Sequence, residues 1–179
     1  MARVRNDVPM VKSQPNVKLQ AWTTRTPVGP FSLLAHEGRV VRAGFTDDVE
    51  ELLENAPDND GAEHVSEIPG ITDRVTAYLE GDLRAIDEIE VAPVGSERKR
   101  GAWTVMRTVA PGTISYRELS ERMDAPASPR SAARACATNP IALIVPCHRF
   151  ISSDGKLHGF GWGLHVKEWL LDHEERFTA

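Results

Sequence analysis

The sequence lacks several features that would set it apart from ordinary globular proteins. No apolar run approaches the ~20 residues that a membrane-spanning helix needs. The first residues lack the apolar core of a signal peptide, and no internal repeat or low-complexity segment is present. The composition, with 41% hydrophobic and 26% charged residues, is that of a globular protein. We therefore expect a cytoplasmic protein with no membrane partner.

Cysteine is scarce. The 179 residues contain only Cys136 and Cys147, with no CxxC pair, so neither a disulfide framework nor a zinc site is predicted. We expect no metal and no cofactor. Cys136 lies in an Ala-rich run and is interpreted as a small buried residue. Cys147 is followed directly by His148 and Arg149, a neighbourhood typical of a reactive thiol.

Charge is unevenly distributed. The net charge is −5, but residues 1–95 carry 9 Lys/Arg against 17 Asp/Glu (−8), and residues 96–179 carry 12 against 9 (+3). A basic half beside an acidic half is typical of a protein that binds a polyanion on one side. A solvated surface with uneven charge explains the same numbers equally well, so charge alone leaves both interpretations open.

The first half predicts a small antiparallel sheet with a helix. Residues 1–18 are polar and are expected to form a tail. Residues 19–23, 30–35 and 40–45 are expected to be strands, and Thr46 is expected to cap a short helix. A loop at 57–63, a helix over 71–79 stopped by Gly81 and an extended piece over 82–94 should follow. We assign residues 19–95 to an N-terminal α/β domain and place a hinge at 94–96.

The second half, residues 96–179, predicts a mostly helical domain, so the fold class is α+β. Ser96 should cap a helix reaching residue 109, and Ser115 opens a capping box for a helix to about residue 123. Ser128-Pro129 should start a third helix over 130–138 after a tight connection at 124–127. The last two helices would form a helix-turn-helix. Arg130 and Arg134, one turn apart, favour nucleic acid, although an Ala-rich helix is usually a packed core helix.

The five apolar residues 141–145 lie between two prolines, directly before Cys147. A short β-branched run of this kind predicts a buried strand. Such a strand, with a thiol beside an imidazole at its end, would be a rigid support for a nucleophile.

Several motifs together resemble the O6-alkylguanine-DNA alkyltransferase family. They are Ser115-Tyr116, Arg130 in a small-residue helix, Asn139-Pro140, the tetrapeptide Pro-Cys-His-Arg ending at Arg149, Gly-Phe-Gly-Trp-Gly over 159–163 and Lys-Glu-Trp-Leu-Leu over 167–171. The likeness is close over 111–174 and looser over 19–95. It implies a single-turnover transfer of an O6-alkyl group, chiefly methyl, from a flipped guanine in double-stranded DNA to Cys147.

The resemblance also implies residue roles. His148 and Glu174 would relay the thiol proton through a water, Asn139 would brace the turn, and Tyr116 would donate to guanine N3. Arg130 would fill the gap left by the flipped base, on a helix lying in the minor groove. The DNA-contacting set is Arg130, Ser131, Ala132, Arg134, Ala135 and Tyr116, and the pocket set is Pro146, Phe150, Phe160, Gly161, Trp162 and Gly163.

The sequence departs from the family pattern at the pocket rim. Phe160 stands where many members have Tyr, and Trp162 replaces a Gly found in several. We expect Trp162 to narrow the pocket, so that methyl adducts react well and benzyl adducts poorly. Trp103, Trp169, Leu170 and Leu171 are expected in the core, and His158, His165 and His173 facing solvent. Two alternatives remain: a lesion-binding protein without transfer, and a Cys-His hydrolase. A monomer is expected.

Overall fold

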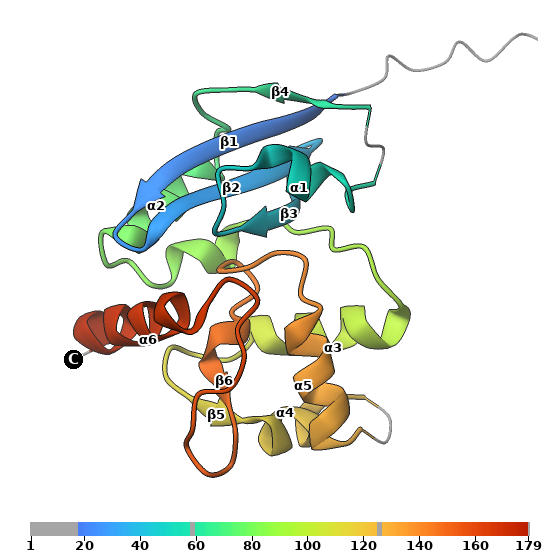
Figure 1. Ribbon diagram of the computed structural model, residues 1–179, viewed down its shortest axis with the longest axis vertical. Helices are drawn as coiled ribbons and strands as arrows, with labels where there is room; N and C mark the ends of the chain where they lie inside the picture. Colours follow the sequence, from blue (N-terminus) through green and yellow to red (C-terminus); the bar gives the residue numbers. More distant parts are fainter. Residues whose placement is uncertain (1–17, 58–59, 125–126, 179) are drawn as a thin grey trace, which may run out of the picture.

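The structure is a computed structural model that describes residues 18–57, 60–124 and 127–178. Figure 1 shows a sheet at one end of the molecule and helices at the other, with the C-terminal helix between them at one side. The elements are, in chain order, β1 (Leu19–Thr26), β2 (Gly29–His36), β3 (Arg39–Gly44), α1 (Val49–Leu53), β4 (Ala62–His64), α2 (Thr72–Leu79), the 3₁₀ turn η1 (Ala85–Glu88), α3 (Glu97–Arg107), β5 (Ile114–Ser115), α4 (Tyr116–Arg122), α5 (Pro129–Ala137), the 3₁₀ turn η2 (Cys147–Arg149), β6 (Phe150–Ile151) and α6 (Leu164–Thr178).

The sheet has the order β3-β2-β1-β4. The three predicted strands pair antiparallel as expected, and Glu37 and Gly38 make the β2–β3 turn with φ of 47° and 75°. Positive φ at both positions is the geometry of a tight hairpin. The sheet is mixed rather than antiparallel, because β4, which begins within the predicted loop at 57–63, pairs parallel to β1. Strand β4 has only three residues, too few for an alternating pattern to be recognised in the sequence.

Two further expectations for the first half were wrong. Asp48, not Thr46, caps α1: its side chain accepts from the Glu51 backbone N–H, while the Thr46 hydroxyl accepts from Asp48 N–H. Residues 82–94 contain η1 instead of one extended piece, and Val91 makes a bridge to Val40. The helix α2 ends before Gly81, which has φ of 113°, as predicted.

The second half folds largely as its capping residues predict. Ser96 caps α3, and Ser115 and Ser128 each form a complete capping box at the start of α4 and α5. Helices α4 and α5 pack against each other as a helix pair. Residues 1–17 of the predicted tail at 1–18, and residues 125–126 of the predicted connection, lie outside the described residues. Within the described part of the chain, no helix is long and apolar enough to cross a membrane.

One apolar core joins the sheet to the helices. It includes Phe31 and Leu33 of β2, Trp103 of α3 and Leu170 of α6, all 2% exposed or less. The predicted core positions Trp169 and Leu171 are only partly buried. The sheet is also tied by backbone hydrogen bonds to the segment before the cysteine: Ala43 of β3 donates to Pro140 O (3.0 Å) and accepts from Ala142 N–H (3.0 Å). The N-terminal half therefore helps to hold the turn that carries Cys147.

Candidate active site

The segment before Cys147 is a buried turn, and the prediction of a strand there was wrong. Only Ile141 makes a β-bridge, to Ala43, after which the chain turns back with Leu143 at φ of 70°. The Val145 N–H donates to Ile141 O at 3.0 Å, closing the turn. A short apolar run fits any buried segment, so its burial was predictable and its backbone conformation was not. All five residues are at most 1% exposed.

Asn139 braces this turn. Its Oδ1 accepts from the Ile141 N–H at 3.0 Å, and its Nδ2 donates to Val145 O at 2.8 Å and to Cys147 Sγ at 3.1 Å. One amide thus bonds both ends of the turn and the thiol itself. Asn139 fixes the position of Sγ and favours its negative form, because an N–H donor stabilises a thiolate.

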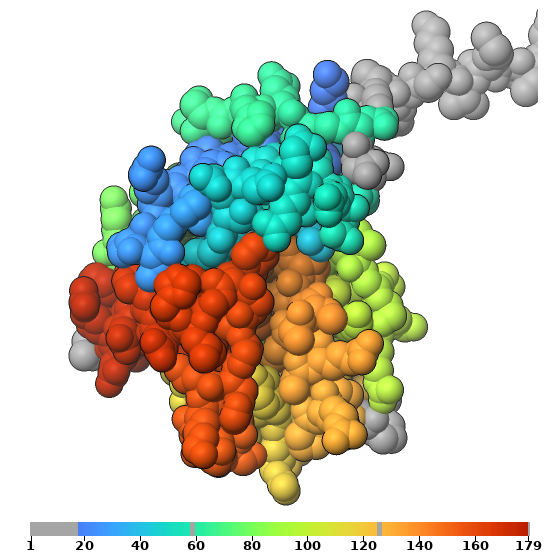
Figure 2. All heavy atoms as spheres, in the orientation of Figure 1, coloured from blue at the N-terminus to red at the C-terminus, as the bar shows by residue number. Residues whose placement is uncertain are grey.

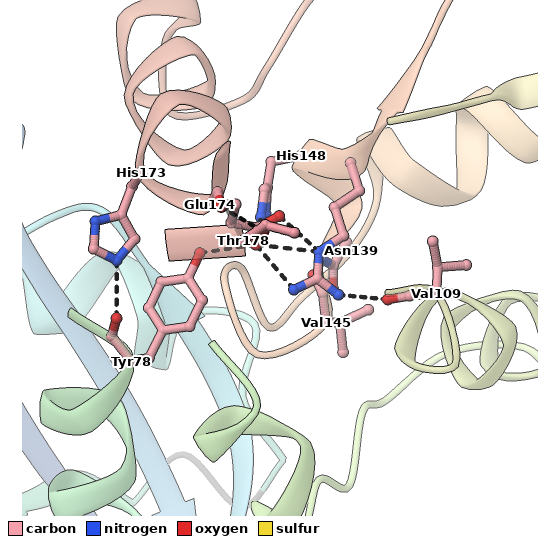
Figure 3. A network of polar contacts seen from close by, with 9 residues as sticks. Tyr78, Val109, Asn139, Val145, His148, His173, Glu174 and Thr178 are labelled. Atoms are coloured by element: carbon pink, nitrogen blue, oxygen red, sulfur yellow. Dashed lines mark hydrogen bonds and ion pairs between the residues drawn. The ribbon is translucent and has the colours of Figure 1, made fainter. Parts of the chain in front are cut away.

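His148 and Glu174 form a buried pair. His148 Nε2 lies 2.8 Å from Glu174 Oε1, and the two residues are 0% and 1% exposed. The same carboxylate accepts from Arg149 Nε (3.0 Å to Oε2) and Nη2 (2.9 Å to Oε1) and from the Tyr78 hydroxyl (2.9 Å to Oε1). Figure 3 shows the side chains of Tyr78, His148 and Glu174 meeting from α2, η2 and α6. The resemblance implied His148 and Glu174 as members of this cluster, whereas the parts that Arg149 and Tyr78 play in it were not predicted.

The charges in this cluster decide its resting protonation. Burial raises the pKa of Glu174, but hydrogen bonds and charge from His148 and Arg149 outweigh burial and lower the pKa to about 2. Burial lowers the pKa of His148, against the effect of Glu174. Burial also raises the pKa of Cys147, against Asn139 and the charge of Lys167. The resting site at neutral pH is therefore a neutral thiol beside a neutral imidazole and an ionised carboxylate.

His148 has one ring nitrogen left for chemistry. Its Nε2 is bound to Glu174, and its Nδ1 is buried with no hydrogen-bond partner among the described residues. An imidazole with one free nitrogen, whose other nitrogen is bound to a carboxylate, has the arrangement of a general base. The geometry allows His148 to accept a proton at Nδ1 while Glu174 stabilises the imidazolium.

Lys167 is a buried cation beside the thiol. It is 1% exposed, and its Nζ donates to Phe150 O at 2.7 Å. Its charge lowers the pKa of Cys147, and the thiol in turn acts to raise the pKa of Lys167 against the larger effect of burial. The sequence motif contained Lys167, but nothing in the pattern indicated that its ammonium turns inward.

Cys147 opens into a small cavity of about 60 Å³. Its walls come from α4, α5, the turn that carries Cys147, the segment before α6 and α6 itself. They are Tyr116, Ala133, Cys136, Ala137, Asn139, Cys147, Gly159, Phe160, Gly161, Trp162 and Lys167. Among the predicted pocket residues, Phe160, Gly161 and Trp162 line it, whereas Pro146, Phe150 and Gly163 do not. Phe150 is 0% exposed and packs in the core instead.

Two walls of the cavity carry further information. Burial, then the charges of Cys136 and Cys147, raise the pKa of Tyr116 to about 12, so its hydroxyl stays protonated and available as a donor. The ring of Trp162 packs against β3 at Gly44, where an added Cβ would lie 2.3 Å from two ring carbons. Cys136 was predicted to be a small buried residue, but it is only partly buried and lines the cavity.

Helix α5 forms one side of this cavity and presents another side to solvent. Figure 2 shows α5, in orange, beside the orange-red segment that follows Cys147, on one face of the molecule. Arg130 and Arg134 are exposed on it, and Ser131 is partly exposed within the capping box. Ala132 and Ala135 are 0% and 3% exposed and pack in the core, so the prediction that they contact DNA was wrong. The helical spacing that turns the arginines outward turns these two alanines inward.

The remaining histidines separate into two kinds. His158 and His165 are exposed, as predicted. His173 is 5% exposed, and its Nε2 donates to the Tyr78 backbone O at 2.8 Å, so the prediction of a solvent-facing residue was wrong. No group of three or more His, Cys, Asp or Glu side chains in the described residues could hold a metal ion.

A helix pair with exposed arginines, packed against a buried cysteine with a His–Glu pair, defines a DNA-binding protein with a reactive thiol. Residues 97–176 match the family model described as "6-O-methylguanine DNA methyltransferase, DNA binding domain". A methylated-DNA–protein-cysteine methyltransferase of Salmonella typhimurium is 35% identical over 156 residues, spanning 83% of this chain and 91% of the relative. One of Mycolicibacterium paratuberculosis is 35% identical over 158 residues, spanning 87% and 92%. The chain belongs to the methylated-DNA–protein-cysteine methyltransferase family.

Solved structures agree with this assignment. The Mycobacterium tuberculosis O6-methylguanine methyltransferase superposes with a TM-score of 0.72 at 28% identity, covering 90% of this chain and 95% of that one. The M. tuberculosis protein solved in complex with DNA gives a TM-score of 0.72 at 27% identity, covering 88% and 94%. The α+β architecture described above is therefore that of the family, over nearly the whole of each chain.

Proposed function

We propose that the protein repairs O6-alkylguanine in double-stranded DNA by moving the alkyl group onto Cys147. One observation carries the proposal: the buried thiol, the phenol of Tyr116 and the inner side of helix α5 share a single cavity. A base that enters from a DNA duplex held by α5 would reach the thiol directly. Family membership supports the same reaction.

The chemistry follows from the resting protonation. Cys147 is a neutral thiol, so its proton has to leave as the sulfur attacks the alkyl carbon. His148 accepts that proton at Nδ1, directly or through one water, and Glu174 stabilises the imidazolium. The S–C bond forms while the C–O6 bond breaks, and the electron pair of that bond stays on guanine O6. The proton held by His148 then neutralises the guanine anion, and the Tyr116 hydroxyl, donating to guanine N3, offsets the developing charge.

The product determines how often the protein acts. Cys147 ends as a thioether, which offers no good leaving group for a second transfer. The donor Asn139 and the cation Lys167 stabilise a thiolate but give no means of removing an alkyl group from sulfur. The reaction stops after one turnover, and the protein is consumed as a stoichiometric reagent that works as a monomer in the cytoplasm.

The DNA contact is made by the exposed side of α5. The alkyl carbon lies inside the duplex, so the base is flipped out before it reacts. Arg130 fills the gap, Arg134 and Ser131 contact the backbone, and the exposed side of α5 lies in the minor groove. The test compares Arg130→Ala with Arg134→Ala. Arg130→Ala slows repair of duplex DNA but not reaction with free O6-benzylguanine, whereas Arg134→Ala weakens binding and lowers its salt dependence.

Trp162 limits the size of the adduct. Its ring lines the cavity and is held against Gly44, so one wall is closed by a large rigid side chain. We expect O6-methylguanine to react faster than O6-benzylguanine, and Trp162→Gly to reduce the difference. Comparable rates for the two adducts in the wild-type protein would contradict this role.

The transfer itself is tested by intact-mass spectrometry after incubation with a duplex containing O6-methylguanine. The expected result is a gain of one methyl group on Cys147, absent in Cys147→Ala and kept in Cys136→Ala, which removes the other thiol of the cavity. Binding without a mass gain would indicate a lesion-binding protein instead. Repeated turnover of a small-molecule ester without a stable adduct would indicate a hydrolase.

A further inference from the structure

Tyr78 contributes a hydroxyl to the catalytic cluster from the opposite half of the chain. It lies on α2, 0% exposed, and its hydroxyl donates to Glu174 Oε1 at 2.9 Å. Figure 3 shows its side chain pointing from α2 to the carboxylate on α6. Position 78 lies outside residues 97–176, the part of the chain that matches the DNA-binding-domain model.

The oxygen that Tyr78 touches is the one that holds the histidine. Glu174 Oε1 accepts from His148 Nε2 at 2.8 Å, from Arg149 Nη2 at 2.9 Å and from the Tyr78 hydroxyl. Donors that bind the same carboxylate oxygen compete for its lone pairs, so each added hydrogen bond weakens the other hydrogen bonds to that oxygen. The Tyr78 hydroxyl thereby controls how strongly Glu174 pulls on His148.

We infer that Tyr78 is a positioning residue of the proton relay, through which the N-terminal half sets the basicity of His148. The inference rests on the proposed function, because the relay has a task only if Cys147 loses its proton during transfer. Burial, and then Glu174, raise the pKa of Tyr78 well above its usual value. Its hydroxyl therefore stays protonated and acts as a donor at every pH at which the protein works.

The direction of the effect follows from the charges around His148. The groups that face it are Glu174 and Lys167 from α6, Arg149 beside it in η2, and Tyr78 behind Glu174. Burial lowers the pKa of His148, Glu174 raises it, and the two cations lower it. Removing the Tyr78 hydroxyl leaves Oε1 with more density for His148 Nε2–H, which favours the imidazolium and raises the pKa of His148.

The test is the pH dependence of single-turnover methyl transfer in Tyr78→Phe. The rate falls on the acid side as His148 becomes protonated, and in Tyr78→Phe this fall moves to higher pH by roughly half a unit. Titration of the His148 ring signals by NMR, in the unreacted protein, shows the same shift without any reaction. A role in packing alone would lower stability and leave both titrations in place.

His173→Phe is the matched control. His173 joins the same two helices, since its Nε2 donates to the Tyr78 backbone O at 2.8 Å, and its ring stacks on Trp169. The hydrogen bond of its ring goes to that carbonyl and not to the Glu174 carboxylate. The His173→Phe variant should have a lower melting temperature than wild type and the same pH profile of methyl transfer. Equal profiles for Tyr78→Phe and wild type would overturn the inference while leaving the transfer intact. Failure of the wild-type protein to gain a methyl group would instead overturn the proposed function.

Discussion

Replacing Glu174 by Gln tests whether the buried carboxylate supports the fold as well as the relay. The substitution keeps the size of the side chain and removes its charge, so Arg149, 1% exposed, loses the partner that neutralises it. Removing one partner of a buried ion pair costs ~3–5 kcal/mol. The carboxylate gives an independent figure: its pKa lies at about 2 instead of 4.5. At ~1.4 kcal/mol per unit, this difference corresponds to about 3–4 kcal/mol.

The two figures agree, and the pKa also predicts the pH dependence. Because the pKa of Glu174 is depressed in the folded protein, its stabilisation is complete above pH 4.5 and is lost as pH falls towards 2. The unfolding free energy of wild type should therefore exceed that of Glu174→Gln by about 3 kcal/mol at pH 7. The difference should narrow below pH 4.5, because the carboxylate then takes up a proton in the unfolded wild-type chain before it does so in the folded protein.

Urea unfolding followed by circular dichroism at several pH values measures this difference. The matched control is Glu175→Gln, which makes the same change one residue further along α6 on an exposed side chain. We expect the control to stay within about 0.5 kcal/mol of wild type. A loss below ~1 kcal/mol in Glu174→Gln, or a difference that stays constant from pH 7 to pH 3, would refute the reasoning.

Three further changes have defined outcomes. Asn139→Ala removes the brace of the turn and the donor to Cys147. It should lower the free energy of unfolding, measured in urea, by ~2–3 kcal/mol and slow methyl transfer. An unchanged transfer rate would show that the brace is dispensable. Lys167→Met should raise the pKa of Cys147, seen as a shift of iodoacetamide alkylation to higher pH, and an unmoved profile would contradict it. Gly44→Ala should displace Trp162 and change the ratio of methyl to benzyl transfer, which would stay constant if Trp162 were not part of the wall.

Local signals in the sequence predicted most of the helices. The N-caps Ser96, Ser115 and Ser128 were identified correctly because a capping side chain bonds a backbone group only three residues away. Strand β4 was missed for the opposite reason. It consists of three residues, and its partner β1 lies some forty residues earlier in the chain.

The candidate site divides in the same way. Cys147, His148 and Asn139 were predicted because the resemblance rests on short motifs that contain them, and Glu174 because the close likeness extends to residue 174. The alanines of α5 were misassigned because a small residue fits a DNA contact and a packed core equally well. Only the packing of α5 against its neighbours shows that Ala132 and Ala135 face the core rather than solvent.

The sequence by itself determined which chemistry is present: a thiol beside an imidazole, and helices that begin at fixed caps. The tertiary structure alone decided what surrounds that chemistry. Arg149, Lys167 and Tyr78 turn inward because the folded chain offers them a carboxylate or a carbonyl at hydrogen-bond distance. Such partners lie between 17 and 96 residues apart in the chain. No local pattern encodes contacts of that range, since they exist only after the sheet and the helices have packed around one core.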